Sequence, residues 1–172
     1  IKELSENDEF QIVAKEIPLV KKLIDTGYTG RKGKGGFYRM NKSGNQKILE
    51  AINLETGEYT NSKKIDLGVE TVNINNLINR KDKYGEYAWE VISKIIKYAS
   101  SLVPGITDKF NDIDEAMRLG FNWAMGPFEM LKSIGVENFF SRIDNFENNK
   151  FLENLSKSKD ENFYGERQLY TD

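Results

Sequence analysis

The 172-residue sequence contains neither cysteine nor histidine. The absence of cysteine excludes disulfides, a thiolate nucleophile and cysteine-bound metals, and it favours an intracellular setting. The absence of histidine excludes an imidazole base, a histidine metal ligand and a serine–histidine triad. Few catalytic designs remain, so we expect no catalytic residue and no metal site in this chain.

Long apolar runs and an excess of positive charge are also missing. No stretch reaches the roughly 18 apolar residues of a membrane span, and the first ten residues lack the pattern of a signal peptide. The formal net charge of −2 gives no general attraction for nucleic acid. We therefore expect a folded cytoplasmic protein with no membrane span and no nucleic-acid partner. The first residue is Ile1 and not methionine, which predicts an internal fragment.

Apolar residues at helical spacing predict a mainly α protein. The longest predicted helix covers 84–103, and we expect it to be the central buried helix, stopped by Pro104. Its expected apolar face is built on Tyr87, Val91, Ile95, Tyr98 and Leu102, widened by Trp89, Ile92, Ile96 and Ala99. Shorter helices are predicted at 18–24, 74–78, 136–143 and 151–155.

The stretch 112–135, DIDEAMRLGFNWAMGPFEMLKSIG, begins with a short amphipathic helix. Asn111 or Asp112 is expected to cap its first turn, and Gly120 to supply the left-handed residue that ends it. The polar residues expected to point away from the apolar face are Asp112, Asp114, Glu115 and Arg118.

A second helix is predicted to follow an aromatic corner. Pro127 is suited to its first position, and Gly135 to its end. The rings expected to pack into the core around this corner are Phe121, Trp123 and Phe128. The stretch thus predicts a helix, a tight corner and another helix.

The whole pattern, ID-x-A-M-x-x-G-F-x-W-x-x-GPFE-x-x-x-x-IG, resembles the motif in the C-terminal helical domain of the 3-hydroxyacyl-CoA dehydrogenases. It is most similar to bacterial β-oxidation proteins with two tandem copies of that domain, which continue into an enoyl-CoA hydratase. The positions taken as its structural motif are Asp114, Trp123, Gly126, Pro127, Phe128 and Gly135. The resemblance implies a helical bundle like the C-terminal domain of 6-phosphogluconate dehydrogenase. Lys132 stands where the family often has aspartate.

A glycine-rich basic stretch covers 27–39. It fails the spacing of a Walker loop, and Tyr38 stands where a dinucleotide fingerprint needs its third glycine. A flexible turn remains in which Arg31, Lys32 and Lys34 are close together, and both a solvated loop and an anion site stay open. The stretch also resembles the G-x-x-G-[RK]-K-x-G-x-GFY signature that ends a copy of the same helical domain.

The order of the two motifs predicts the organisation of the chain. Residues 1–40 would be the tail of a first helical copy, 41–83 a hairpin and linker, 84–155 a second copy, and 156–172 a polar tail. Strand candidates at 37–40, 46–54 and 57–60 predict a small β-hairpin or three-stranded patch between the copies, with turns at 41–44 and 55–57.

The resemblance implies an oxidoreductase that passes hydride between NAD and 3-hydroxyacyl-CoA. Its catalytic dyad and NAD site belong to a Rossmann domain that this sequence lacks, so we expect no NAD binding here. Helical domains of this kind are implied to close over acyl-CoA and to make a dimer contact. The three phosphates of acyl-CoA make Arg31, Lys32 and Lys34 candidate substrate-binding residues. A non-catalytic helical protein-interaction module is the alternative, and weak nucleic-acid binding through the basic loop is a third.

Overall fold

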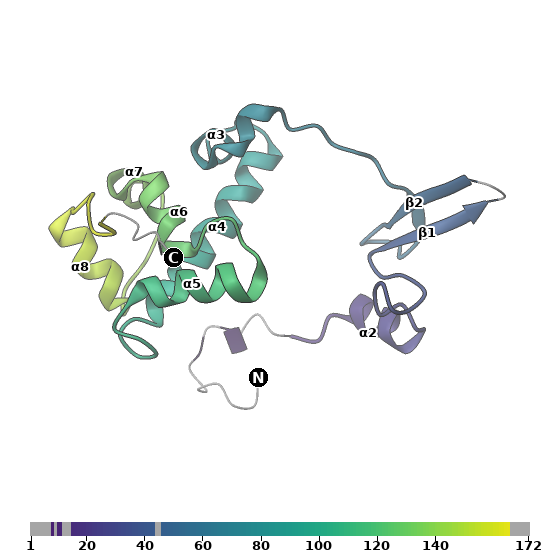
Figure 1. The fold of residues 1–172 in the computed structure, drawn as a ribbon, viewed down its shortest axis with the longest axis horizontal. Coiled ribbons are helices and arrows are strands. Elements are labelled where there is room, and N and C mark those ends of the chain that lie inside the picture. Colours follow the sequence, from purple (N-terminus) through teal and green to yellow (C-terminus); the bar gives the residue numbers. More distant parts are fainter. Residues whose placement is uncertain (1–7, 9, 12–14, 44–45, 166–172) are drawn as a thin grey trace, which may run out of the picture. The chain divides into compact units, whose positions relative to one another are not determined.

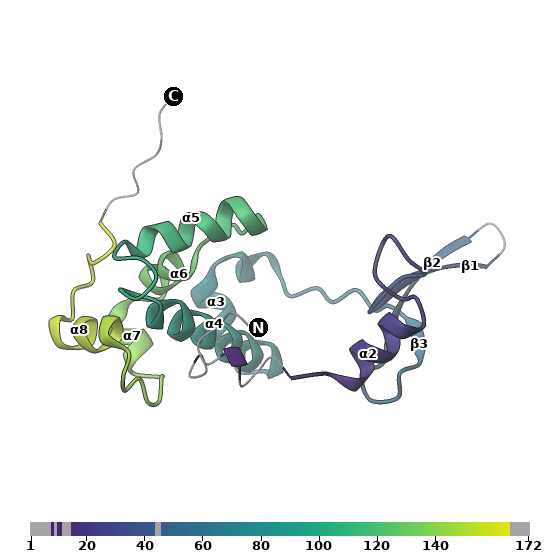
Figure 2. The ribbon, with the colours of Figure 1, turned by 90° about the horizontal axis from the view of Figure 1, so that it is seen from below.

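The computed structural model describes residues 8, 10–11, 15–43 and 46–165. The chain divides into two compact units, Ile1–Asp66 and Leu67–Asp172 (Figures 1 and 2). The division falls within the segment 41–83, which the sequence marks as hairpin and linker. The assignment of the two sides to two helical copies stays a prediction.

The described part of the first unit includes the helix α2 and a small sheet. Its elements are α2 (Pro18–Asp25), β1 (Tyr38–Ser43), β2 (Gln46–Ile52) and β3 (Tyr59–Asn61). The strands pair antiparallel in the order β1-β2-β3, so the predicted three-stranded patch is confirmed. The first predicted turn begins too early, because Asn41 continues β1 opposite Ile48. Residue 44 of this predicted turn lies outside the described part.

The second unit is helical. Its elements are η1 (Val69–Val72), α3 (Ile74–Ile78), α4 (Lys83–Ser101), α5 (Phe110–Phe121), α6 (Pro127–Ile134), α7 (Val136–Phe140) and α8 (Lys150–Ser158). The central position expected for α4 is confirmed, since α3, α6 and α8 all pack against it. Helices therefore predominate over the small sheet of the first unit, and the described protein is mainly α, as predicted.

The buried face of α4 lies to one side of the predicted centre. Tyr87 is 69% exposed, whereas Ile96 is fully buried and Ala99 nearly so. Two small polar residues, Ser93 and Ser100, share the buried face. Their size lets neighbouring helices approach closely, and the Ser100 hydroxyl is satisfied by the carbonyl of Ile96 at 2.6 Å.

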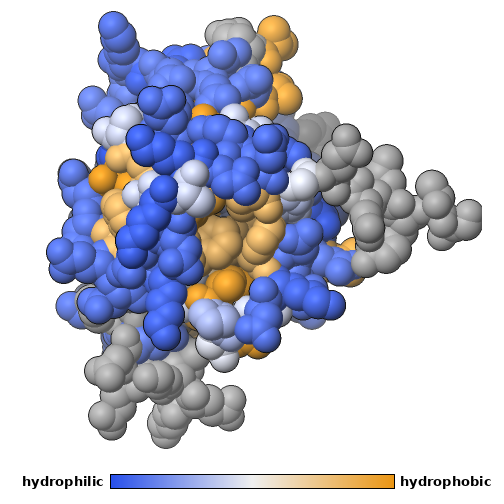
Figure 3. Space-filling view, turned by 90° about the vertical axis from the view of Figure 1, so that its left-hand side faces the viewer, coloured by the Kyte–Doolittle hydropathy of each residue, from blue (hydrophilic) through white to orange (hydrophobic). Residues whose placement is uncertain are grey.

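Two adjoining apolar clusters make the core of the helical unit. The larger contains Ile78, Ile96, Leu131, Ile134, Val136, Phe139, Leu152 and Leu155. The smaller contains Ala99, Phe128 and Tyr164, with half-buried rings around them. On the face of the molecule shown in Figure 3, hydrophilic residues surround a smaller area in which apolar side chains reach the surface.

The ends of α5 differ from the prediction, and those of α6 agree with it. Lys109 precedes α5 without a side-chain cap, and Asn122, at φ 55°, is the left-handed residue that ends it. Gly120 therefore lies inside the helix. Pro127 opens α6 and Gly135 ends it, both as predicted.

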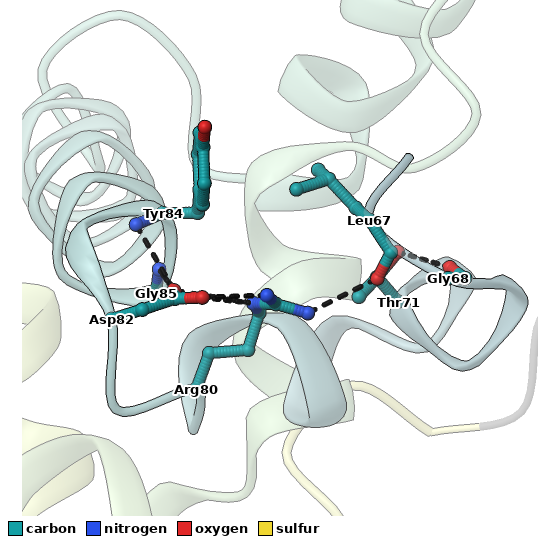
Figure 4. Close-up of polar contacts among 7 residues, drawn as sticks. All are labelled: Leu67, Gly68, Thr71, Arg80, Asp82, Tyr84 and Gly85. Carbon is teal, nitrogen blue, oxygen red and sulfur yellow. Dashed lines mark hydrogen bonds and ion pairs between the residues drawn. The ribbon is translucent and has the colours of Figure 1, made fainter. Parts of the chain in front are cut away.

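The start of α4 is fixed by Asp82 (Figure 4). Its carboxylate accepts the backbone N–H groups of Tyr84 and Gly85, both at 3.1 Å, and pairs with Arg80. Arg80 also donates to the carbonyl of Leu67 at 3.0 Å, which ties the segment before η1 to this helix start. These contacts, the hydrogen bond from Arg80 foremost, lower the pKa of Asp82 to about 2.

Candidate functional site

Asp114 is the central residue of the predicted motif, and its side chain is fully buried. The expectation that it points away from the apolar face is therefore wrong. Its two carboxylate oxygens accept the backbone N–H groups of Phe128 and Glu129, each at 2.9 Å. These are unpaired amides of the first turn of α6, so Asp114 on α5 caps a neighbouring helix.

Gly126 explains why the cap comes from another helix. As the residue before α6 it has no side chain to offer, and a Cβ added there would collide with Asp114. Its own N–H donates to the Glu129 carboxylate at 2.8 Å, which closes the same turn from the other side. Glycine is required here by close approach, because the buried carboxylate takes the space of a side chain.

Arg118 and Tyr164 complete a polar cluster with Asp114 and Glu129. Arg118 pairs with Glu129 at 2.6 Å, and both side chains are largely buried. The Tyr164 hydroxyl donates to the Asp114 carboxylate and accepts from Arg118. The cluster thus contains two carboxylates, one guanidinium and one phenol, each with a partner.

Burial shifts the pKa values of this cluster. It raises the pKa of Asp114, against the opposing effect of the hydrogen bonds from Phe128, Tyr164 and Glu129. Burial, together with the nearby Asp114 charge, raises the pKa of Tyr164 to about 12. For Arg118 burial acts in the lowering direction, but the bonds to Glu129 and Tyr164 outweigh it and the pKa is raised.

The aromatic corner divides into buried and exposed parts. Phe128 is fully buried against Phe110 and Phe151, with ring centroids 5.1 and 5.0 Å away. Trp123 is only half-buried. Phe121 is 69% exposed, so its predicted place in the core is wrong. Neighbouring Leu119 is 79% exposed, and the end of α5 therefore presents apolar side chains to its surroundings.

An open hollow of about 350 Å³ lies beside the polar cluster. Its lining residues are Ala124, Met125, Glu129, Lys132, Ser133 and Tyr164. Lys132 is exposed, and its ammonium donates to the carbonyl of Gly165 at 2.6 Å and lies 5.5 Å from the centre of the Tyr164 ring. The contact of Lys132 with the segment after α8 could not be found from local sequence signals.

The basic loop of the first unit is held in shape by its own backbone. Gly30 and Gly35 form a β-bridge, and the N–H of Lys34 donates to the carbonyl of Gly27 at 3.1 Å. The three candidate cations are all exposed, but they are not equivalent. Lys34 donates its ammonium to the carbonyl of Thr26 at 3.1 Å. Arg31 and Lys32 are therefore the better placed of the three to meet an anion.

A second polar group, not predicted from the sequence, supports this loop. Arg39 pairs with Glu50 at 2.6 Å and lies 3.9 Å from the centre of the Tyr59 ring. Tyr59 stacks on Tyr28, and its hydroxyl donates to the carbonyl of Gly36 at 2.5 Å. The cross-strand register of β1 and β2 brings Arg39 opposite Glu50. The sequence does not reveal this register, so the pair was not predicted.

Metal and dinucleotide chemistry find no support in the described residues. Among them, no group of three or more histidine, cysteine, aspartate or glutamate side chains could hold a metal ion. The sheet they form is antiparallel, whereas a dinucleotide site is built at the carboxyl ends of parallel strands. The described sheet therefore does not fit NAD. Separately, no helix in the described part of the chain is long and apolar enough to cross a membrane.

The region that contains the 112–135 motif is similar to a known protein family. Residues 85–162 match the profile of the family described as 3-hydroxyacyl-CoA dehydrogenase, C-terminal domain. This part of the chain belongs to that family. The matched range includes Asp114, Arg118 and Glu129 of the polar cluster but not Tyr164. The resemblance predicted from the 112–135 motif is confirmed.

Three relatives extend the similarity beyond that domain. A Rickettsia felis protein assigned the name fatty acid oxidation complex trifunctional enzyme is 37% identical over 142 residues, which cover 83% of this chain and 19% of that protein. Its namesake in Rickettsia prowazekii is 36% identical over 143 residues, with the same coverage. A Bacillus subtilis protein assigned as a 3-hydroxyacyl-CoA dehydrogenase is 30% identical over 129 residues, or 71% of this chain and 16% of that protein.

The chain spans about a fifth of the length of these curated relatives. The matched length in the Rickettsia proteins exceeds the helical unit, so the similarity reaches into the first unit as well. No solved structure gives a significant match.

Proposed function

We propose that this chain is the helical, substrate-closing and dimerisation-type region of an NAD-dependent 3-hydroxyacyl-CoA dehydrogenase of cytoplasmic fatty acid β-oxidation. Hydride transfer would take place on a Rossmann domain elsewhere in the complete enzyme. The observation that supports this most is the family match across 85–162, which runs from the first turn of α4 to beyond α8. The lack of histidine assigns the catalytic base to another part of the enzyme.

The role we assign to the helical unit is to hold an apolar surface in place. The Asp114 cap fixes α6 against α5, and the end of α5 exposes Leu119 and Phe121. Exposed apolar groups of this kind suit contact with the Rossmann domain, with acyl-CoA or with a second copy. The same surface is what favours the alternative, a non-catalytic interaction module.

A first test separates these two functions in the complete enzyme. Leu119→Ser with Phe121→Ser should lower kcat/KM for 3-hydroxyacyl-CoA while NAD binding is kept, because the substrate side of the enzyme loses a contact. Asn111→Ala, an exposed change on the same helix, is the control. Dehydrogenase kinetics equal to wild type in the double variant would favour the interaction module.

We also propose that the basic loop of the first unit binds the phosphate groups of acyl-CoA. The support is the exposure of Arg31 and Lys32 on a loop with a fixed backbone. Replacing both with alanine in the complete enzyme should raise KM for acyl-CoA, leave KM for NAD unchanged and weaken the salt dependence of acyl-CoA binding. Lys34→Ala should have a smaller effect on acyl-CoA, since that ammonium is already bonded to Thr26.

The matched control removes the same charge from the same unit. Lys63 and Lys64 are exposed, and their double alanine variant should leave both KM values unchanged. If it raises KM for acyl-CoA as much as the Arg31 and Lys32 variant does, the effect is one of general charge and the loop is a solvated turn.

A further inference from the structure

The segment Asp160–Gly165, which follows the C-cap of α8, is fastened to three other helices, α5, α6 and α7. The first attachment is made by Glu161, whose carboxylate accepts the backbone N–H groups of Val136 and Glu137, each at 2.9 Å. These amides open α7, and the residue before them, Gly135, has no side chain to cap them. Glu161 therefore does for α7 what Asp114 does for α6.

Tyr164 makes the second attachment. Its side chain is 8% exposed, and its hydroxyl bonds with Asp114 and Arg118 inside the polar cluster. Its ring packs against Phe110 with centroids 5.6 Å apart. The third attachment is the bond from Lys132 on α6 to the carbonyl of Gly165 at 2.6 Å.

The segment has little structure of its own to hold it there. The helix before it, α8, ends at Ser158, and its C-cap residue Lys159 takes a left-handed conformation at φ 51°. The backbone hydrogen bonds within the segment are two short turns, from Phe163 to Asp160 and from Gly165 to Asn162. Its position depends on the three attachments and on the Phe163 ring, which packs against Phe110 and Phe151 with centroids 5.8 and 6.0 Å apart. Of the three attachments, two involve residues beyond 162, where the family match ends.

We propose that Asp160–Gly165 is a strap that fastens and releases as one unit, and that it sets how accessible the start of α6 is to water. Fastened, it covers Asp114 and supplies Tyr164 as one wall of the hollow beside Met125. Released, it exposes the buried carboxylate and leaves the first turn of α7 without its cap. Because the attachments are at most four residues apart, loss of one frees the segment to move and weakens the others. The strap rests on these contacts alone and does not depend on the proposed function.

Amide hydrogen exchange of the purified chain tests this coupling. Glu161→Ala removes the α7 attachment, which is made to the amides of Val136 and Glu137 and not to those of Phe128 and Glu129. We expect the exchange of those two α6 amides to rise about tenfold or more. In the reverse direction Tyr164→Phe, which keeps the ring and removes the hydroxyl, should raise exchange at Val136 and Glu137. Lys132→Met should raise exchange at both sets.

Two controls make the outcome decisive. The amide of Ile96, in the middle of α4, reports global unfolding, so the expected increases are those in excess of any change at Ile96. Glu147→Ala removes an exposed negative charge just before α8 and should change neither set of amides. If each variant raises exchange only at the amides it contacts, or only in step with Ile96, the segment is not a strap that releases as one unit.

Discussion

Replacing Asp114 with alanine should destabilise the chain more than other polar substitutions on α5. The change leaves the N–H groups of Phe128 and Glu129 and the hydroxyl of Tyr164 without their buried acceptor. An unsatisfied buried donor costs roughly 1–3 kcal/mol, and loss of a helix cap roughly 0.5–2 kcal/mol. Water entering the site offsets part of the sum, so we expect a loss of about 3–5 kcal/mol in the free energy of unfolding, as when a buried ion pair is broken.

Asp114→Asn separates the two physical effects that act on this carboxylate. Asparagine keeps the shape and one acceptor oxygen, but its NH₂ group faces a second N–H donor, which predicts a loss of about 1–3 kcal/mol. The opposing effect is the cost of burying a charge, and the raised pKa of Asp114 shows that its partners do not fully offset this cost. The sign of the asparagine result therefore shows which effect is larger.

The assay is urea denaturation at neutral pH, followed by far-UV circular dichroism. Asn111→Ala is the control, an exposed change on the same helix that should stay within about 0.5 kcal/mol of wild type. If Asp114→Ala lies within about 1 kcal/mol of this control, the cap contributes little and the argument fails. An asparagine variant more stable than wild type would show that desolvation of the carboxylate outweighs its hydrogen bonds.

Three further predictions use the same measurement. Phe128→Ala should cost about 3–5 kcal/mol because the ring is fully buried, whereas Trp123→Ala should cost clearly less because that ring is half-buried; equal losses would contradict the packing. Gly126→Ala should destabilise the chain, because the added Cβ collides with Asp114. Gly120→Ala should stabilise it by about 0.5–1 kcal/mol, since this helical glycine has nothing within 4 Å of an added Cβ. A loss of stability in Gly120→Ala would contradict the helical position of Gly120. Asp82→Asn should lower the urea midpoint at neutral pH but not at about pH 2. Because the pKa of Asp82 is lowered in the folded chain, its contribution to stability is present above its unfolded pKa and is lost as pH falls towards about 2. A difference between variant and wild type that stays unchanged across that range would refute this assignment.

Elements with local signals were predicted well. Pro127 and Gly135 mark the ends of α6 by their backbone preferences alone, and the five residues of α3 follow Asn73, which caps that helix through its side chain. In each case the information lies within a few residues of the boundary. Local chemistry also misled at Gly120, because Asn122 can take the left-handed conformation and sits two residues later.

The polar cluster could not be predicted because its members are far apart in sequence. Asp114 bonds to amides 14 and 15 residues away, and Tyr164 comes from the segment assigned to a polar tail. One signal was present. A helix that opens with Gly126 and Pro127 has no side-chain cap of its own, so an acceptor from elsewhere was needed, and Asp114 is an acid on the preceding predicted helix.

The wrongly predicted direction of Asp114 on α5 is related to the function we propose. The helix turns a carboxylate inward at Asp114 and large apolar groups outward at Leu119 and Phe121, the reverse of what an isolated amphipathic helix favours. Leaving two such side chains in water forgoes roughly 1.5–3 kcal/mol each, which is substantial beside the roughly 5–15 kcal/mol that stabilises a whole domain. The buried carboxylate is explained by the cap it provides for α6. Among the described residues of this unit the exposed apolar side chains have no such compensation, and a neighbouring surface that covers them in the complete enzyme would provide it.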